Sequence, residues 1–173
     1  MGRILPTRRF LSAVSIIAGA LLGASTAAVA QSSIEGTWIT PQKAEVTIAA
    51  CGDAYCGTLS WIVIPDENSA ACEMNRDAFA VQMVDFQNPD PTLRERSLVG
   101  MEILKLNARG TRTFDGRIYN AQDGKSYDGV VTVLGPDTIE LGNGCAFGMC
   151  VMTQEWHRVA ARLEAPGFTC RSN

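Results

Sequence analysis

Polar and apolar side chains alternate along much of the chain. In residues 44–50 the small or apolar Ala44, Val46, Ile48 and Ala50 alternate with the other positions, a period of two that predicts a half-buried strand. Residues 57–64 alternate in the same way and are predicted to be its hairpin partner, with Leu59, Trp61 and Val63 on one face.

Further strands are predicted on both sides of this hairpin, and turn signals rich in Gly, Asn, Asp and Pro separate them. Their expected ranges are 37–39, 98–106, 113–119, 127–134, 138–142 and 149–159. Short strands at regular spacing, without alternating helices, are typical of an all-β fold. The pattern predicts eight antiparallel strands, as a sandwich or an up-and-down barrel.

The alternation of polar and apolar residues stops between Pro65 and Gly100, where one long loop or short helical insertion is expected. Residues 66–69 are predicted to be a loop, and residues 70–85 are ambiguous. The two prolines of residues 88–91 exclude a sheet interior, because proline lacks a backbone donor. Asp90 before Pro91 resembles a helix start, so residues 91–96 are predicted to form a short helical turn.

Two motifs near the ends of the strand region suggest how the sheet closes. Gly36-Thr37-Trp38 begins the first strand, and Trp156-His157-Arg158 lies in the last. If these strands are neighbours in a closed sheet, the Arg158 guanidinium can stack on the Trp38 indole. Gly36, Trp38 and Arg158 are therefore predicted to close the barrel.

Residues 1–30 have the pattern of a cleaved secretory signal. Three arginines precede an apolar run over residues 10–22, and Ala28-Val29-Ala30 is a small-residue cleavage site. The apolar run is too short for a permanent membrane span, so none is expected after cleavage. Arg8-Arg9 raises the twin-arginine route, but the residues that follow fit it poorly, and the general route is preferred. The protein is expected to be periplasmic or secreted.

The exported part, residues 31–173, is expected to be a single domain. It carries 12 Lys and Arg side chains against 18 Asp and Glu, a net charge of −6, because three of the 15 basic residues lie in residues 1–30. This acidic balance argues against nucleic acid as a partner. The pattern does not indicate an oligomeric state.

All six cysteines of the chain lie in the exported part, where an oxidising compartment favours disulfides. Cys51 and Cys56 enclose four residues, as do Cys145 and Cys150, and such hairpin loops bring their flanking residues within disulfide reach. These two pairs leave Cys72 to pair with Cys170. The alternative, a zinc site, fits export poorly, so no metal is expected.

No catalytic constellation is evident, and the protein is expected not to be an enzyme and to need no cofactor. His157 is the only histidine, and strand alternation puts it on the face opposite Trp156 and Arg158. Asp123, Asp128 and Glu140 could be paired carboxylates, but turn and strand-face acids are more often solvated.

The candidate ligand-binding residues are few. Arg94 and Arg96 could recognise an anion at a barrel mouth, although a loop in which Asp90 and Glu95 hold both arginines is favoured because acid exceeds base. Three aromatic residues could line an interior or could simply be core; they are Trp61, Tyr119 and Tyr127.

The order of these motifs resembles the family called domain of unknown function 2147, which consists of small exported bacterial proteins. The resemblance is carried by stretches across nearly the whole exported part: residues 36–38, 51–57, 88–96, Gly100, 116–120, 123–127 and 154–159. Residues 65–88, with Cys72, depart from it as a longer insertion. The resemblance implies a lipocalin-like barrel and no established activity. It also implies that Gly36, Trp38 and Arg158 are similar to the lipocalin closure motif.

Three functional hypotheses follow. The first is a binding barrel for a small apolar or amphipathic ligand, because eight strands leave room either for one small ligand or for side chains alone. The second is a filled barrel that acts as an envelope interaction or structural protein. The third, an enzyme, has the least support.

Overall fold

A closed antiparallel barrel of eight strands forms the body of residues 33–170 in the computed structural model, which describes residues 2, 33–145 and 149–170. The predicted signal, residues 1–30, lies outside the described residues apart from Gly2. The barrel strands are β1 (Gly36–Ile39), β2 (Glu45–Cys51), β3 (Ala54–Val63), β4 (Glu102–Ala108), β5 (Thr113–Asn120), β6 (Lys125–Gly135), β7 (Thr138–Asn143) and β8 (Met152–Val159).

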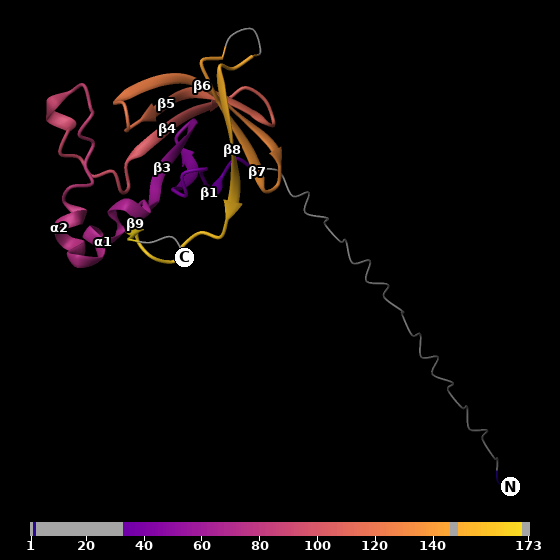
Figure 1. Ribbon diagram of the computed structural model, residues 1–173. Coiled ribbons are helices and arrows are strands. Elements are labelled where there is room, and N and C mark those ends of the chain that lie inside the picture. Colours follow the sequence, from indigo (N-terminus) through magenta and orange to yellow (C-terminus); the bar gives the residue numbers. More distant parts are fainter. Residues whose placement is uncertain (1, 3–32, 146–148, 171–173) are drawn as a thin grey trace. The chain divides into compact units, whose positions relative to one another are not determined.

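Each strand pairs with its neighbours in sequence, and β1 pairs with both β2 and β8, so the sheet closes on itself (Figure 1). This up-and-down order confirms the all-β barrel and excludes the sandwich. A short ninth strand, β9 (Gly167–Thr169), runs parallel to the end of β3. We call the end that carries the turns 40–44 and 120–125 and the insertion the mouth end. The opposite end, with Arg158, is the closed end.

Several of the predicted bounds are wrong. The last strand begins at Met152 rather than at residue 149, and the helical turn predicted over residues 91–96 ends at Leu93. The fourth strand begins at Glu102 rather than at residue 98, because residues 98–101 turn back toward β3 through Gly100, whose φ is +80°. Residues 66–69 are not a loop but the first turn of helix α1 (Asp66–Met74). Pro65 precedes this turn, and Asp66 and Glu67 place negative charge at the helix start, where it is favourable.

Buried side chains fill the interior of the barrel. One cluster of thirteen residues, each less than 9% exposed, brings together Ile34, which precedes β1, and inward positions of β1, β2 and β4–β8. Its members are Ile34, Trp38, Val46, Ile48, Leu104, Leu106, Phe114, Ile118, Val131, Val133, Ile139, Leu141 and Trp156. The alternation seen in the sequence is therefore the alternation between this core and the outer face.

Arg158 links the first and last strands at one end of the barrel. Its guanidinium lies 4.1 Å from the centre of the Trp38 ring, and the two residues are opposite one another across β1 and β8. The guanidinium also donates to the carbonyl oxygens of Glu35 at 2.7 Å, Ser33 at 2.8 Å and Pro136 at 2.7 Å. Any side chain at Gly36 would collide with it, since a Cβ there would lie 2.1 Å from an Arg158 nitrogen. These contacts lie where the first and last strands meet, and the closure role of the three residues stays a prediction.

The insertion between β3 and β4 has its own small core. It contains α1, α2 (Arg76–Ala80) and the single 3₁₀ turn η1 (Pro91–Leu93), and Figure 1 shows both α-helices beside β9. Asp90 caps η1 by accepting from the Thr92 amide at 2.9 Å, as the sequence predicts. The core joins the insertion to β9; its buried residues are Ile64, Cys72, Met83, Phe168 and Cys170.

All six cysteines form disulfides with the predicted partners. Cys51 bonds Cys56 at the β2–β3 hairpin, Cys145 bonds Cys150 before β8, and Cys72 bonds Cys170. The last bridge spans 98 residues and ties the C-terminal segment to α1. Residues 160–166 thereby run from the closed end of β8 back to the mouth end of β3; we call them the strap.

The predicted face of Trp61 is wrong. Leu59 lies opposite Val46, but Trp61 lies opposite Glu45, so a β-bulge at Ser60 shifts the alternation by one residue. Directly opposite residues share a face, and Trp61 is therefore on the outer face with Glu45, not in the interior. It remains 91% buried because Arg162 of the strap stacks over its ring at 4.1 Å.

Candidate functional site

A cleft lies at the mouth end, between the insertion and the β5–β6 hairpin. Its volume is about 760 Å³, and we call it the mouth cleft. Its lining combines apolar, aromatic and charged side chains; these include Pro89, Leu93, Arg96, Glu102, Tyr119, Asp123, Lys125 and Tyr127. Tyr119 and Tyr127 lie on opposite faces of their hairpin, because Tyr127 is opposite the core residue Ile118 and Tyr119 is opposite Ser126. The cleft is therefore lined from both the inner and the outer face of the barrel at its mouth end.

Asp85 organises the insertion side of the cleft. Its carboxylate is fully buried and accepts hydrogen bonds from Tyr119 at 2.6 Å, Asn88 at 2.6 Å and Arg96 at 2.7 Å. A buried carboxylate is tolerated only when it is paired and hydrogen-bonded, and here three different donors satisfy it. The network fixes the positions of Arg96 and the Tyr119 ring in the cleft wall.

The pKa values of this network show which protonation states the fold favours. Burial alone would raise the pKa of the Asp85 carboxyl, but the hydrogen bonds from Tyr119, Asn88 and Arg96 hold it below its ordinary value. Burial, together with the hydrogen bond to Asp85, raises the pKa of Tyr119 to about 12. At neutral pH, Asp85 is therefore an anion, and Tyr119 remains a neutral donor.

The opposite wall is built by the β5–β6 turn. Tyr127 donates a hydrogen bond to Asp123, which lowers the pKa of the Asp123 carboxyl and raises that of Tyr127. Gly124, with φ +69°, lets the turn approach the insertion so closely that a Cβ there would lie 1.9 Å from the Gln87 carbonyl oxygen. The Lys125 side chain is exposed beside this contact, and it supplies the cleft with a cation outside the Asp85 network.

Three of the five candidate ligand-binding residues meet in this cleft: Arg96, Tyr119 and Tyr127. Arg94 does not line it, since its Nε donates to the Asn88 carbonyl oxygen at 2.8 Å and braces the loop. Trp61 lies on the outer face of β3, under the strap.

The predicted partners of the arginines are wrong in one respect. Asp85, rather than Asp90 or Glu95, pairs with Arg96, while Asp90 caps η1. Asp85 lies at the end of the ambiguous segment 70–85, where no periodicity marked it. Lys125 and Asp123 were also missed as cleft residues, although a charged pair flanking the glycine of a tight turn was a usable signal.

The remaining polar candidates lie apart. His157 is exposed on β8, whereas Trp156 beside it is buried. Asp128 pairs with Arg117 on an exposed strand face, and Glu140 lies opposite Glu155. Within residues 33–145 and 149–170, no three His, Cys, Asp or Glu side chains gather as a metal site. No helix in the described part of the chain is long and apolar enough to span a membrane.

Comparisons with known proteins agree with this architecture. The family model of uncharacterized proteins conserved in bacteria (DUF2147) matches residues 36–158. A solved structure from the human pathogen Helicobacter pylori, described as belonging to the lipocalin family, is similar with a TM-score of 0.57 and 23% sequence identity. The match covers 74% of this chain and 84% of that protein. No curated protein matches the chain significantly.

Proposed function

This chain belongs to the DUF2147 family of uncharacterized proteins conserved in bacteria, and from that premise we propose that it is an exported barrel that binds a small amphipathic ligand in the mouth cleft. The observation that carries the proposal is the mixed lining of the cleft. Leu93 and the two tyrosine rings offer apolar surface, and Arg96 and Lys125 offer charge beside it. Sites for small molecules combine apolar walls with a few positioned polar groups in this way.

The position of the proposed site at the rim follows from the packing of the barrel. Small eight-stranded barrels can hold a ligand inside or can be filled by side chains. In this barrel the core cluster around Trp38 and Trp156 occupies interior positions, which supports our choice of the mouth rather than the interior for the proposed ligand. We assign the cleft a binding role without a catalytic step, since no histidine lines it and Asp85, the buried acid behind its wall, is held by three donors.

Export is part of the proposal. Three disulfides support it, because such bonds persist in oxidising compartments such as the periplasm. Residues 1–30 have the pattern of a cleaved signal. Sequencing the N-terminus of the protein recovered from the periplasm of its own host is expected to begin at Gln31, and an intact Met1 in the cytoplasm would contradict export.

The binding proposal is tested with a fluorescent fatty acid, dansylaminoundecanoic acid, as the probe. Leu93→Ser in the cleft is expected to weaken binding about tenfold, because it removes apolar contact area. Leu134→Ser is the matched control, since Leu134 is similarly exposed, 43% against 38%, but lies at the closed end of β6. Equal affinities of the two variants would contradict binding in the cleft.

Native mass spectrometry of protein purified from its own host tests the same proposal without a chosen probe. A reproducible extra mass, lost in the Leu93→Ser variant and kept in Leu134→Ser, is expected. The filled interior also favours a second candidate, an envelope interaction or structural protein. A clean mass, together with a protein partner captured by crosslinking in the host, would favour that candidate instead.

A further inference from the structure

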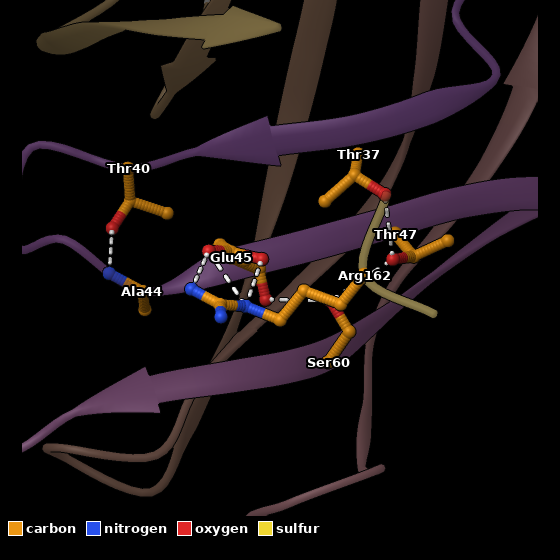
Figure 2. A network of polar contacts seen from close by, with 7 residues as sticks. All are labelled: Thr37, Thr40, Ala44, Glu45, Thr47, Ser60 and Arg162. Atoms are coloured by element: carbon orange, nitrogen blue, oxygen red, sulfur yellow. Dashed lines mark hydrogen bonds and ion pairs between the residues drawn. The ribbon is translucent and has the colours of Figure 1, made fainter. Parts of the chain in front are cut away.

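A second pocket lies on the outer face of the barrel, between strands β1–β3 and the strap. Its volume is about 240 Å³. Four hydroxyl side chains form its floor: Thr37, Thr47, Thr58 and Ser60. Figure 2 shows Arg162 reaching across this floor to Glu45. We call this the strap pocket, and neither the mouth cleft nor the proposed function uses it.

The hydrogen bonds of the floor run in one direction. Ser60 donates to the Glu45 carbonyl oxygen at 3.1 Å, and Thr47 donates to Ser60 at 2.9 Å. A hydroxyl has only one hydrogen to donate. The 3.1 Å contact between the Thr37 and Thr47 hydroxyls must therefore be donated by Thr37. The chain of donors runs from Thr37 through Thr47 and Ser60 to the backbone of β2 (Figure 2).

The direction of these hydrogen bonds determines which kind of ligand the floor of the pocket can bind. Thr58 also uses its hydrogen, on the Thr47 carbonyl oxygen at 3.4 Å. Every hydroxyl hydrogen of the floor is thus engaged within the protein, while each hydroxyl oxygen keeps at least one lone pair. The four hydroxyls of the floor thus present hydrogen-bond acceptors and no free hydrogen, so they favour a ligand that donates. Among the other lining residues, Trp61 has a buried indole N–H without a hydrogen-bond partner, which is a donor.

The charges around the pocket favour the same kind of ligand. Glu45 is 7% exposed, and Arg162 forms three contacts with its carboxylate at 2.7, 3.1 and 3.1 Å. The negative charge of Glu45 and the positive charge of Arg162 cancel one another. Glu164 of the strap also lines the pocket and adds a second carboxylate, so the lining has an excess of one negative charge.

We propose that the strap pocket binds a small organic cation whose ammonium group donates to the threonine and serine oxygens and is balanced by Glu164. An ammonium carries three donors and no acceptor, which matches a floor of acceptors. The volume of about 240 Å³ leaves room for a short alkyl chain, which the covered Trp61 ring and Pro166 would contact.

The test is a titration followed by NMR with three probes of similar size and different charge: propylammonium, propanol and propionate. The indole N–H signal of Trp61 reports on the strap pocket, because Trp38 and Trp156 lie in the barrel core. Propylammonium is expected to shift this signal at the lowest concentration, propanol at a higher one, and propionate not at all. A similar response to all three probes, or none to propylammonium, would overturn the proposal.

Two variants assign the binding to the named groups. Glu164→Gln is expected to weaken the binding of propylammonium about two- to fivefold, which is the effect of one partly exposed charge. The affinity for propanol should not change. Glu155→Gln, an equal charge change on an exposed residue of β8, is the matched control and should have no effect. Thr58→Val keeps the shape of the side chain but removes a hydrogen-bond acceptor, so it should weaken the binding of both propylammonium and propanol. Equal effects of Glu164→Gln and Glu155→Gln, or the same Trp61 shift from potassium chloride, would contradict an organic cation site.

Discussion

Single arginines have very different roles in this protein, although all carry the same charge. Arg158 stacks on Trp38 and donates to three backbone carbonyls, and Arg162 stacks on Trp61 and holds Glu45. Arg117 meets Asp128 on an exposed surface, where both side chains are more than half exposed. A planar guanidinium with five donors can bridge a ring and several carbonyls at once, which an ammonium cannot.

Arg158→Lys is therefore expected to lower the free energy of unfolding by about 2 to 3 kcal/mol, because lysine keeps the charge but loses the stacking and the fork of donors. Arg117→Lys is the control, and a change within about 0.5 kcal/mol is expected there because its ion pair is solvated. Urea denaturation of both variants provides the measurement. Equal losses in the two would show that Arg158 does not close the barrel.

The buried carboxylate of Asp85 makes the insertion sensitive to acid. Its pKa in the folded state lies below the ordinary value of 3.8, so its contribution to stability is present above that pH and is lost as the pH falls through the folded pKa. Asp85→Asn is expected to cost about 3 kcal/mol at neutral pH, since it leaves Arg96 without its anionic partner. Asp128→Asn should change the urea midpoint little, because that carboxylate is exposed. The measurement is the urea midpoint of wild type and of Asp85→Asn at neutral pH and below pH 3.8. The wild type should lose more stability in acid than the variant, and an equal loss would contradict the role of the Asp85 carboxylate.

Tyr119 makes the stability of the same network sensitive to alkaline pH. Its folded pKa of about 12 lies above the ordinary value of 10.0, so the stability that it contributes is complete below pH 10.0 and is lost as the pH rises toward 12. In a near-ultraviolet titration, the difference between wild type and Tyr119→Phe should show one tyrosine that ionises near pH 12. A midpoint near 10.0 would mean that the phenol is not held by Asp85.

Among the elements, the β5–β6 turn and the insertion depend on one another. Gly124 lies against the Gln87 carbonyl oxygen, while Gly52 in the β2–β3 turn has nearly the same φ, +68° against +69°, with nothing near its missing Cβ. The two glycines differ in contact but not in backbone strain. They therefore form a matched pair for measuring how firmly the insertion is held to the barrel.

Gly52→Ala is expected to cost about 1 kcal/mol, the effect of a side chain at positive φ. Gly124→Ala should cost clearly more, because the turn and the loop at Gln87 must also separate. Limited proteolysis is the second readout, and cleavage within residues 65–101 should rise only in Gly124→Ala. Equal stability and equal cleavage in the two variants would show that the insertion is not anchored at this turn.

At the scale of the whole molecule, a disulfide ties the C-terminal segment to the insertion. The strap leaves the closed end of β8, crosses the outer face and rejoins the sheet through β9, which pairs with only three residues of β3. Cys72–Cys170 then links β9 to α1, supported by Arg76 over the Phe168 ring at 4.2 Å. Insertion, strap and barrel are thus joined into one structure at the mouth end.

Replacing Cys72 and Cys170 together by alanine is expected to lower the free energy of unfolding by about 4 to 5 kcal/mol, because the bridge closes a loop of roughly 98 residues. Replacing Cys51 and Cys56 should cost about 2 kcal/mol, since that loop is short. Thermal and urea unfolding of the two double variants would measure the difference. Equal costs would mean that the long bridge does not restrict the unfolded chain.

Local patterns in the sequence were enough to predict the barrel strands, the Asp90 cap and the two short disulfides. Each of these depends on residues close together in the chain: a period of two, a side chain beside a backbone amide, or cysteines on one hairpin. The pairing of Trp38 with Arg158 was also predictable, because a closed sheet makes the first and last strands neighbours.

The candidate sites depended on contacts that no local pattern contains. The bulge at Ser60 moved Trp61 to the outer face, and only the pairing register of β2 with β3 shows it. Asp85 meets Tyr119 and Glu45 meets Arg162 across 34 and 117 residues of sequence. Such pairs form only after the chain has packed, since burial is what makes each carboxylate require a partner. The strand pattern thus follows from the sequence alone, whereas both pockets are products of long-range packing.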